Sequence, residues 1–121
     1  MDINLLLKDL VNSVDGATGA LLLEADGEAI GWYSLTDDND QLRLRGAYVA
    51  VVMRGFREFG PRTSIGKLKR LIIAYENANL IAEEVELDCW VVLELKPLVS
   101  VGPAIHRMQT ASDRFRQELT T

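Results

Sequence analysis

The residues best suited to catalysis are a single histidine, His106, and a single cysteine, Cys89. His106 falls on the polar side of a predicted C-terminal helix, with no cysteine or second histidine at metal-ligand spacing. Cys89 opens the apolar run 89–93, where a thiol behaves as a small hydrophobic side chain and burial raises its pKa. We therefore interpret His106 as a surface residue and Cys89 as part of the core, and we expect no enzymatic activity and no cofactor.

Two segments resemble ligand-binding loops without matching them. Segment 60–68 has five residues between its glycines where a phosphate loop has four, and Leu68 replaces the magnesium-binding hydroxyl. It also leads from a helix into a strand, the reverse of what a phosphate cradle requires. The acidic segment 37–40 begins like a calcium loop, but Leu42 stands at the turn glycine and Tyr48 at the bidentate carboxylate. We interpret 37–40 as a helix cap and predict no metal site.

A group of carboxylates is the remaining candidate for acid and base chemistry. Such a pair would require one carboxylate to be buried, and we expect a solvated acidic hairpin instead. A dinucleotide site is also excluded, because Gly27 and Gly31 lie in a predicted hairpin that does not lead directly into a helix. The carboxylates in question are Glu83, Glu84, Glu86 and Asp88.

Composition indicates one globular domain over residues 1–121. Hydrophobic residues make up 48% of the chain and charged residues 26%, which is enough apolar surface to build a core. The net charge of −5 opposes binding to nucleic acid or to an anionic membrane surface. The sequence shows no secretion signal or membrane span, and its lone cysteine suits a reducing compartment. We expect a cytoplasmic protein that does not insert into membranes.

The hydrophobic pattern predicts the order helix, two strands, helix, three strands, helix. Asp2 and Gly16 bracket the first helix, Gly60-Pro61 stops the second, and Ser100 starts the third. The predicted helices cover 3–14, about 39–59 and 101–119, and the predicted strands cover 20–23, 29–33, 68–75, 80–85 and 89–95.

Charge predicts the position of each strand, because a strand covered on both faces is apolar throughout and an edge strand tolerates lysine. The runs 20–23 and 89–93 carry no charge, whereas the first strand of the second group carries Lys67, Lys69 and Arg70. We therefore predict an α+β fold with a five-stranded antiparallel sheet in the order 2-1-5-4-3. The second helix covers one face, and the first and third helices cover the other.

The second helix has two apolar sides. One carries Leu42, Val49, Met53 and Phe56, and the nearly opposite one carries Leu44, Tyr48, Val51, Gly55 and Phe59. A helix over one face of a sheet needs only one apolar side, so the second side requires a cover, for which a second copy across a two-fold axis is the simplest choice. The alternative is burial within one monomer. The remaining arc carries Arg43, Ala47, Arg54 and Glu58.

The element order and the segment 19–31, with its Asp26-Gly27 turn, resemble the roadblock / dynein light chain family. This resemblance implies a roadblock-like (profilin-like) fold and a homodimer built through the second helices and the edge strands. It also implies a platform for small Ras-like GTPases or motor complexes, which in bacteria includes polarity and gliding-motility GTPases. The charges on the expected edge strand and Pro103 in the third helix depart from the family pattern.

We therefore predict a non-catalytic homodimer that binds and regulates, or scaffolds, a small Ras-like GTPase. The predicted dimer interface is Leu44, Tyr48, Val51 and Gly55, and the predicted partner-binding arc is Arg43, Ala47, Arg54 and Glu58. The alternative is a small-molecule sensor with a pocket between sheet and helix, lined by Trp32, Tyr33 and Trp90.

Overall fold

The structure is a computed structural model that describes residues 2–36, 38–85 and 88–119. Within these ranges, three helices and five strands follow one another in the predicted order. Their bounds are α1 Ile3–Ser13, β1 Ala17–Leu23, β2 Ala29–Ser34, α2 Asn39–Arg62, β3 Arg70–Ala74, β4 Asn79–Glu84, β5 Trp90–Leu95 and α3 Val101–Leu119. Every predicted element is present, and the main difference is the length of α2.

The five strands form one antiparallel sheet in the order β2-β1-β5-β4-β3. The central strands are β1 and β5, and Leu21 of β1 lies opposite Val92 of β5. At one edge, Ile72 of β3 lies opposite Ile81 of β4. The central strands are buried on both faces, which explains their nearly continuous apolar sequences. The order predicted from charge is confirmed.

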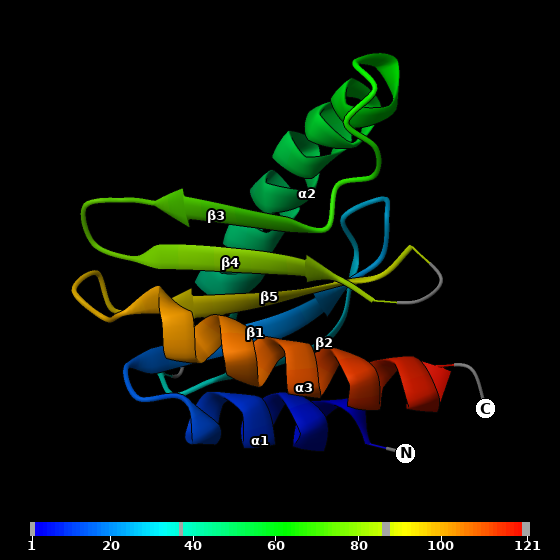
Figure 1. The fold of residues 1–121 in the computed structure, drawn as a ribbon. Helices are drawn as coiled ribbons and strands as arrows, with labels where there is room; N and C mark the ends of the chain where they lie inside the picture. The colour runs from blue at the N-terminus through cyan, green and yellow to red at the C-terminus, as the bar shows by residue number, and fades with distance from the viewer. Residues whose placement is uncertain (1, 37, 86–87, 120–121) are drawn as a thin grey trace.

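Helices cover both faces of the sheet, with α1 and α3 side by side on one face and α2 on the other (Figure 1). Alternate residues of β1 point into the two layers. Ala20 and Leu22 pack with α1 and α3, whereas Leu21 and Leu23 pack with α2. The predicted placement of the helices is therefore confirmed.

Side-chain caps fix the starts of two helices. Asp2 accepts a hydrogen bond from the Asn4 N–H at 3.0 Å at the start of α1, and Asp38 accepts from the Gln41 N–H at 3.1 Å at the start of α2. Asp37, the first residue of the predicted acidic cap, lies outside the described residues. Asp38 thus serves α2 as a cap, as predicted.

The end of α2 differs from the prediction, because the helix continues through Gly60-Pro61 to Arg62. A proline disfavours the helical conformation of the preceding residue partly through that residue's Cβ, and Gly60 has none. The Gly60 carbonyl accepts the N–H of Ile65 at 3.1 Å and that of Gly66 at 3.3 Å, so the chain reverses after this extra turn. A side chain at Gly60 would clash with the Gly66 carbonyl oxygen. As a result, the C-terminal end of α2 projects beyond β3 (Figure 1).

Candidate functional site

One side of α2 faces the sheet and the opposite side is exposed. Leu42 and Met53 are buried against the sheet, whereas the side opposite them contains Tyr48, 67% exposed, and Val51, 60% exposed. Gly55 lies among these exposed residues, with open space where a side chain would stand. The structure therefore brings the four predicted interface residues onto one exposed surface. Its exposed apolar residues, which we call the α2 stripe, are Leu44, Tyr48, Val51, Val52, Phe56 and Phe59.

The position of Phe56 corrects the prediction that it packs with the buried side of α2. Its side chain is 49% exposed. The physical reason is the length of the helix, because α2 passes the sheet edge at β3 and its projecting end has no strand beneath it (Figure 1). The stripe is therefore wider at the C-terminal end of α2 than the helical periodicity suggests.

The predicted partner-binding arc lies along the side of α2 nearest β2. The guanidinium of Arg43 lies 4.3 Å from the centre of the Trp32 ring on β2, a cation–π contact that orients this arginine. Gly27 in the β1–β2 turn packs so closely on α2 that an added Cβ would lie 3.1 Å from the Ala50 Cβ. The four arc residues, Arg43, Ala47, Arg54 and Glu58, are all exposed.

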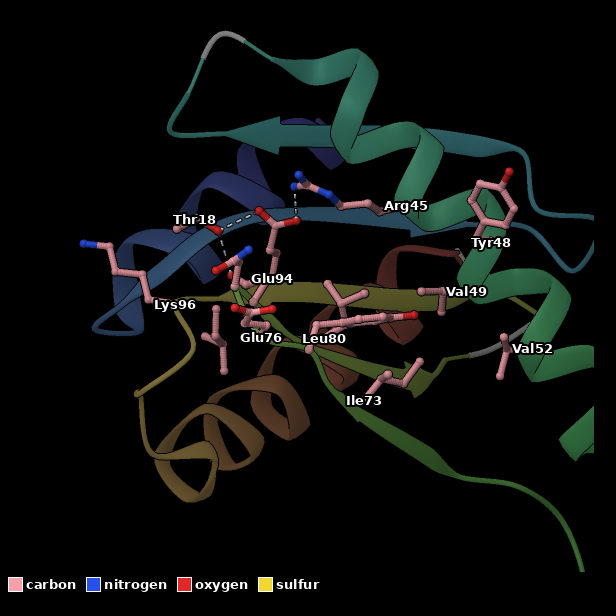
Figure 2. Close-up of a pocket in the computed structure, with 14 residues that line it drawn as sticks. Thr18, Arg45, Tyr48, Val49, Val52, Ile73, Glu76, Leu80, Glu94 and Lys96 are labelled. Atoms are coloured by element: carbon pink, nitrogen blue, oxygen red, sulfur yellow. Dashed lines mark hydrogen bonds and ion pairs between the residues drawn. The ribbon is translucent and has the colours of Figure 1, made fainter.

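A pocket of about 540 Å³ opens between α2 and the strands, next to the stripe (Figure 2). Its apolar end is formed by Tyr48 and Val52 of α2, Ile73 of β3 and Leu80 of β4. Tyr75, in the β3–β4 turn, adds a second aromatic ring. The pocket lies between sheet and helix, where the alternative sensor function placed one, and its volume falls in the range typical of small-molecule sites.

Glu94 of β5 organises the polar end of the pocket (Figure 2). Its side chain is 12% exposed, and its two carboxylate oxygens accept from Arg45 Nη1 at 2.7 Å and from Thr18 Oγ1 at 2.9 Å. Both oxygens have partners, as a carboxylate on a buried strand requires. Sequence reasoning missed this group, although an acidic residue inside the apolar run of β5 was a usable signal. Glu94 is therefore held in a fixed ion pair, and Glu76 and Lys96 also line this pocket.

The aromatic residues predicted to line a pocket do not line this one. Trp90 is fully buried in the core beneath α2, and its indole N–H has no hydrogen-bond partner among the described residues. Trp32 lies under Arg43, and Tyr33 packs on the α1/α3 side of the sheet. The prediction failed because β2 and β5 present these rings away from the β3–β4 turn, where the pocket lies.

The edge strand β3 carries less free charge than its sequence suggested. Lys67 and Lys69 precede β3, which begins at Arg70. Arg70 pairs with Glu83 of β4 through two hydrogen bonds, of 2.9 Å and 3.1 Å, and Lys67 pairs with Glu84 at 2.7 Å. The strand itself therefore contributes one charge, and that charge is neutralised within the chain.

Known structures with the same arrangement identify the architecture. The Roadblock/LC7 domain from Streptomyces avermitilis matches with a TM-score of 0.89 and 20% identity over 100% of both chains. The fold is that of a Roadblock/LC7 domain. Myxococcus xanthus MglB matches with a TM-score of 0.86 and 16% identity, over 98% of this chain and 94% of that one. Profilin IB of Acanthamoeba castellanii matches with a TM-score of 0.64 and 11% identity, over 97% and 98% of the two chains.

The likeness is one of structure. No protein-family model matches the sequence, and no curated protein matches it either. The resemblance seen in segment 19–31 and in the element order is confirmed at the level of the Roadblock/LC7 fold.

Within this Roadblock/LC7 fold, the cysteine and the histidine occupy the predicted kinds of position. Cys89 is buried in the α1/α3 core, and burial raises the pKa of its thiol, with smaller contributions from the charges of Glu24 and Asp88. A raised pKa keeps the thiol protonated near neutral pH, which opposes a nucleophilic role. His106 is exposed on α3. Neither residue adjoins the pocket or the α2 stripe.

The predicted solvated acidic hairpin is only partly correct. Glu83 is 9% exposed and paired with Arg70, and Glu84 is half-buried and paired with Lys67. Glu86 lies outside the described residues, and Asp88 is exposed. The two described glutamates are held by opposite charges on the β3 side, because antiparallel pairing places Arg70 directly across from Glu83.

The β1–β2 turn brings three carboxylates together. Their oxygens lie within 4.8 Å of one another, on Glu24, Asp26 and Glu28, and all three side chains are exposed. Asp26 accepts the Glu28 N–H at 3.0 Å, so this carboxylate shapes the turn. The proximity of these carboxylates follows from the tight β1–β2 turn, in which all three remain exposed to solvent.

Proposed function

We propose that this chain is a non-catalytic homodimeric interaction protein that binds a small Ras-like GTPase and regulates its turnover or its location. The observation that carries the proposal is the α2 stripe, an exposed apolar surface flanked by the charged partner-binding arc. The Roadblock/LC7 fold, which it shares with MglB, supports the assignment.

The α2 stripe supports the homodimer. Contiguous apolar surface of this size mostly marks interaction sites in water-soluble domains. A stripe along one helix can meet its own copy across a two-fold axis, so that the same residues are covered on both chains. Tyr48 and Val51 stand near the middle of α2, where a second α2 would bury them. Among the similar structures, MglB also occurs in a tetrameric arrangement.

The edge strand β3 supports the same arrangement. An edge strand presents unpaired backbone N–H and C=O groups that can pair with another strand. Ile72 is exposed on β3, and the one charge of the strand, on Arg70, is already neutralised by Glu83. The charges that seemed to oppose pairing of two edge strands therefore present a weaker obstacle than the sequence implied.

The partner-binding arc is the proposed contact for the GTPase. Arg43 and Arg54 stand on either side of Ala47 along the helix surface, which gives a shallow surface with charges at its margin. Such a surface suits reversible association more than permanent assembly. In the proposed dimer the arc is displayed twice, because the stripe turns inward and the arc remains outside. The GTPase itself is inferred from the roadblock resemblance.

Surface plasmon resonance with a panel of purified Ras-like GTPases, loaded with GDP or a GTP analogue, tests the contact. Arg54→Glu should slow association roughly tenfold, because charges at an interface margin act mainly on encounter rate. The matched control is Arg107→Glu, which makes the same charge change at an exposed position on α3. Light scattering should show that both variants keep the mass of the wild type.

Two results would redirect the proposal. Equal binding by wild type and Arg54→Glu would place the GTPase site elsewhere on the molecule. An absence of binding by the wild type to every GTPase would favour the second candidate, a small-molecule sensor, which the pocket of about 540 Å³ supports. A sensor should show a saturable rise in melting temperature with one member of a metabolite library, and a scaffold should show none.

A further inference from the structure

Charge is divided unevenly along the chain. The 17 residues 54–70 contain six of the 13 basic residues and one of the 18 acidic residues, which gives a formal charge of +5. The other 104 residues carry −10. The net charge of −5 that argues against anionic surfaces is therefore an average over two unlike regions.

Most of the basic segment lies in the part of the fold that projects from the body, and its last residue, Arg70, begins β3. It contains the end of α2 beyond β3 and the turn that leads back to the sheet (Figure 1). We call residues 54–69 the basic tip. Hydrogen bonds hold its apex in shape, since Thr63 Oγ1 donates to the Phe59 carbonyl at 2.9 Å and the Ile65 N–H donates to the Gly60 carbonyl at 3.1 Å. Ile65 is 74% exposed at this apex.

Most cations of the basic tip remain available to an external partner. Lys67 is engaged with Glu84. Among the residues that the structure describes, the other cations of the tip make no ion pair with a carboxylate. These four are Arg54, Arg57, Arg62 and Lys69.

The layout of these groups favours a surface over a pocket. The cations follow two turns of helix and the succeeding loop, and no described pocket includes them. Ile65 stands between Arg62 and Lys69 in the sequence, which puts an exposed apolar side chain among positive charges. A bilayer with anionic lipids matches both features, because headgroups attract the cations and the apolar side chain enters the headgroup boundary.

We propose that the basic tip binds peripherally to membranes that contain anionic lipids. No helix within the described ranges is long and apolar enough to cross a bilayer, so the contact is confined to the surface. Ionic screening weakens the repulsion from the acidic body, because the tip projects away from it and charges interact weakly beyond roughly 8 Å at physiological salt. The tip shares Phe56 and Phe59 with the α2 stripe and Arg54 and Glu58 with the partner-binding arc. Arg62 and Lys69 belong to neither, so a dimer formed through Tyr48 and Val51 leaves both accessible.

Co-sedimentation with lipid vesicles tests the proposal on the full chain. The wild type should bind vesicles of equal parts phosphatidylglycerol and phosphatidylcholine at low salt, and it should bind pure phosphatidylcholine weakly. Each basic side chain near an anionic surface strengthens binding about fivefold. The double variant Arg62→Glu, Lys69→Glu removes two cations and adds two anions, so it should bind at least about thirtyfold more weakly. Ile65→Ser should bind several-fold more weakly while keeping the salt dependence.

The matched control reverses two cations on the opposite side of the sheet. Lys8→Glu with Arg107→Glu makes the same charge change at exposed positions on α1 and α3, and it should bind nearly as well as the wild type. Circular dichroism and light scattering should show that the fold and the mass of each variant are unchanged. Equal loss in the control, or no binding by the wild type to anionic vesicles at low salt, would overturn the proposal. Binding of polyglutamate without binding of vesicles would also overturn it, in favour of an acidic protein partner.

Discussion

The two faces of the sheet are covered to different degrees. On one face, two helices fill the layer, and Leu7 of α1 and Met108 of α3 are fully buried between helix and sheet. On the other face, a single helix covers the core with one side and leaves the α2 stripe exposed. We infer from this difference that one side of the sheet mainly stabilises the fold and that the other is open to interaction. The α1/α3 side completes its core within the chain, and the α2 side presents apolar surface that the chain does not cover.

Phenylalanine truncations on the two sides should separate these roles. Phe115 of α3 is 1% exposed, and Phe115→Ala should lower the free energy of unfolding by about 3–5 kcal/mol, at any protein concentration. Phe56→Ala removes a half-exposed ring and should cost less than about 1 kcal/mol in dilute solution. Its cost should grow with protein concentration, because the proposed dimer would cover the stripe. Urea unfolding at two concentrations measures both.

Two results would contradict the roles assigned to the two sides of the sheet. A concentration-dependent cost for Phe115→Ala would place the α1/α3 side in an interface. A constant and large cost for Phe56→Ala would mean that the stripe stabilises the monomer itself.

Each face also holds an arginine–carboxylate pair whose carboxylate lies on a strand of the sheet, and these two pairs should differ in strength. Arg70 on the α1/α3 side has a 28% exposed side chain and binds Glu83 through two hydrogen bonds. Arg45 on the α2 side is 48% exposed and binds Glu94, which Thr18 also supports. Arg70→Ala should therefore lower stability by about 2 kcal/mol, and Arg45→Ala by about 1 kcal/mol or less. A larger loss of stability for Arg45→Ala than for Arg70→Ala in thermal unfolding would contradict the view that the α1/α3 side is the better covered side of the sheet.

Much of the fold could be predicted because residues close together in the sequence share the same degree of burial, and their hydrophobicity reflects it. The charge-free runs that became β1 and β5 indicated two central strands, and this fixed the sheet order. Helical periodicity also revealed the two apolar sides of α2, which the structure separates into buried Met53 and exposed Val51. These features follow from the spacing of apolar and charged residues over short stretches, which can be read directly from the sequence.

The remainder depended on contacts between distant residues. The extension of α2 through Pro61 rests on the approach of Gly60 to Gly66. The exposure of Phe56 rests on the projection of α2 beyond β3, the edge strand of the sheet. The pocket arises where the β3–β4 turn meets α2 and Glu94, which no local pattern places together. The predicted dimer and partner-binding residues are exposed as required, and their roles remain predictions.

The smallest expected effect concerns the thiol of the α1/α3 side. Burial raises the pKa of Cys89, so the folded protein holds this proton more tightly than the unfolded chain does. The contribution of the Cys89 thiol to the free energy of unfolding should be fully present below the pKa of an ordinary thiol. It should be lost as the pH rises through the raised pKa of the folded state. Cys89→Ala lacks this titration, so its stability should fall less steeply in alkaline urea titrations. Parallel pH profiles for the two proteins would show that the thiol is solvated.

The most direct test of the account is the mass in solution of the wild type and of two matched arginine variants. Light scattering should give the wild type about twice the 13.5 kDa of one chain. Val51→Arg should be a folded monomer, because burying an unpaired arginine in the stripe costs about 3 kcal/mol or more. Leu98→Arg, at a 98% exposed position before α3, should remain a dimer. A monomeric wild type, or a Val51→Arg protein that stays dimeric, would contradict the assignment of the α2 stripe as the interface.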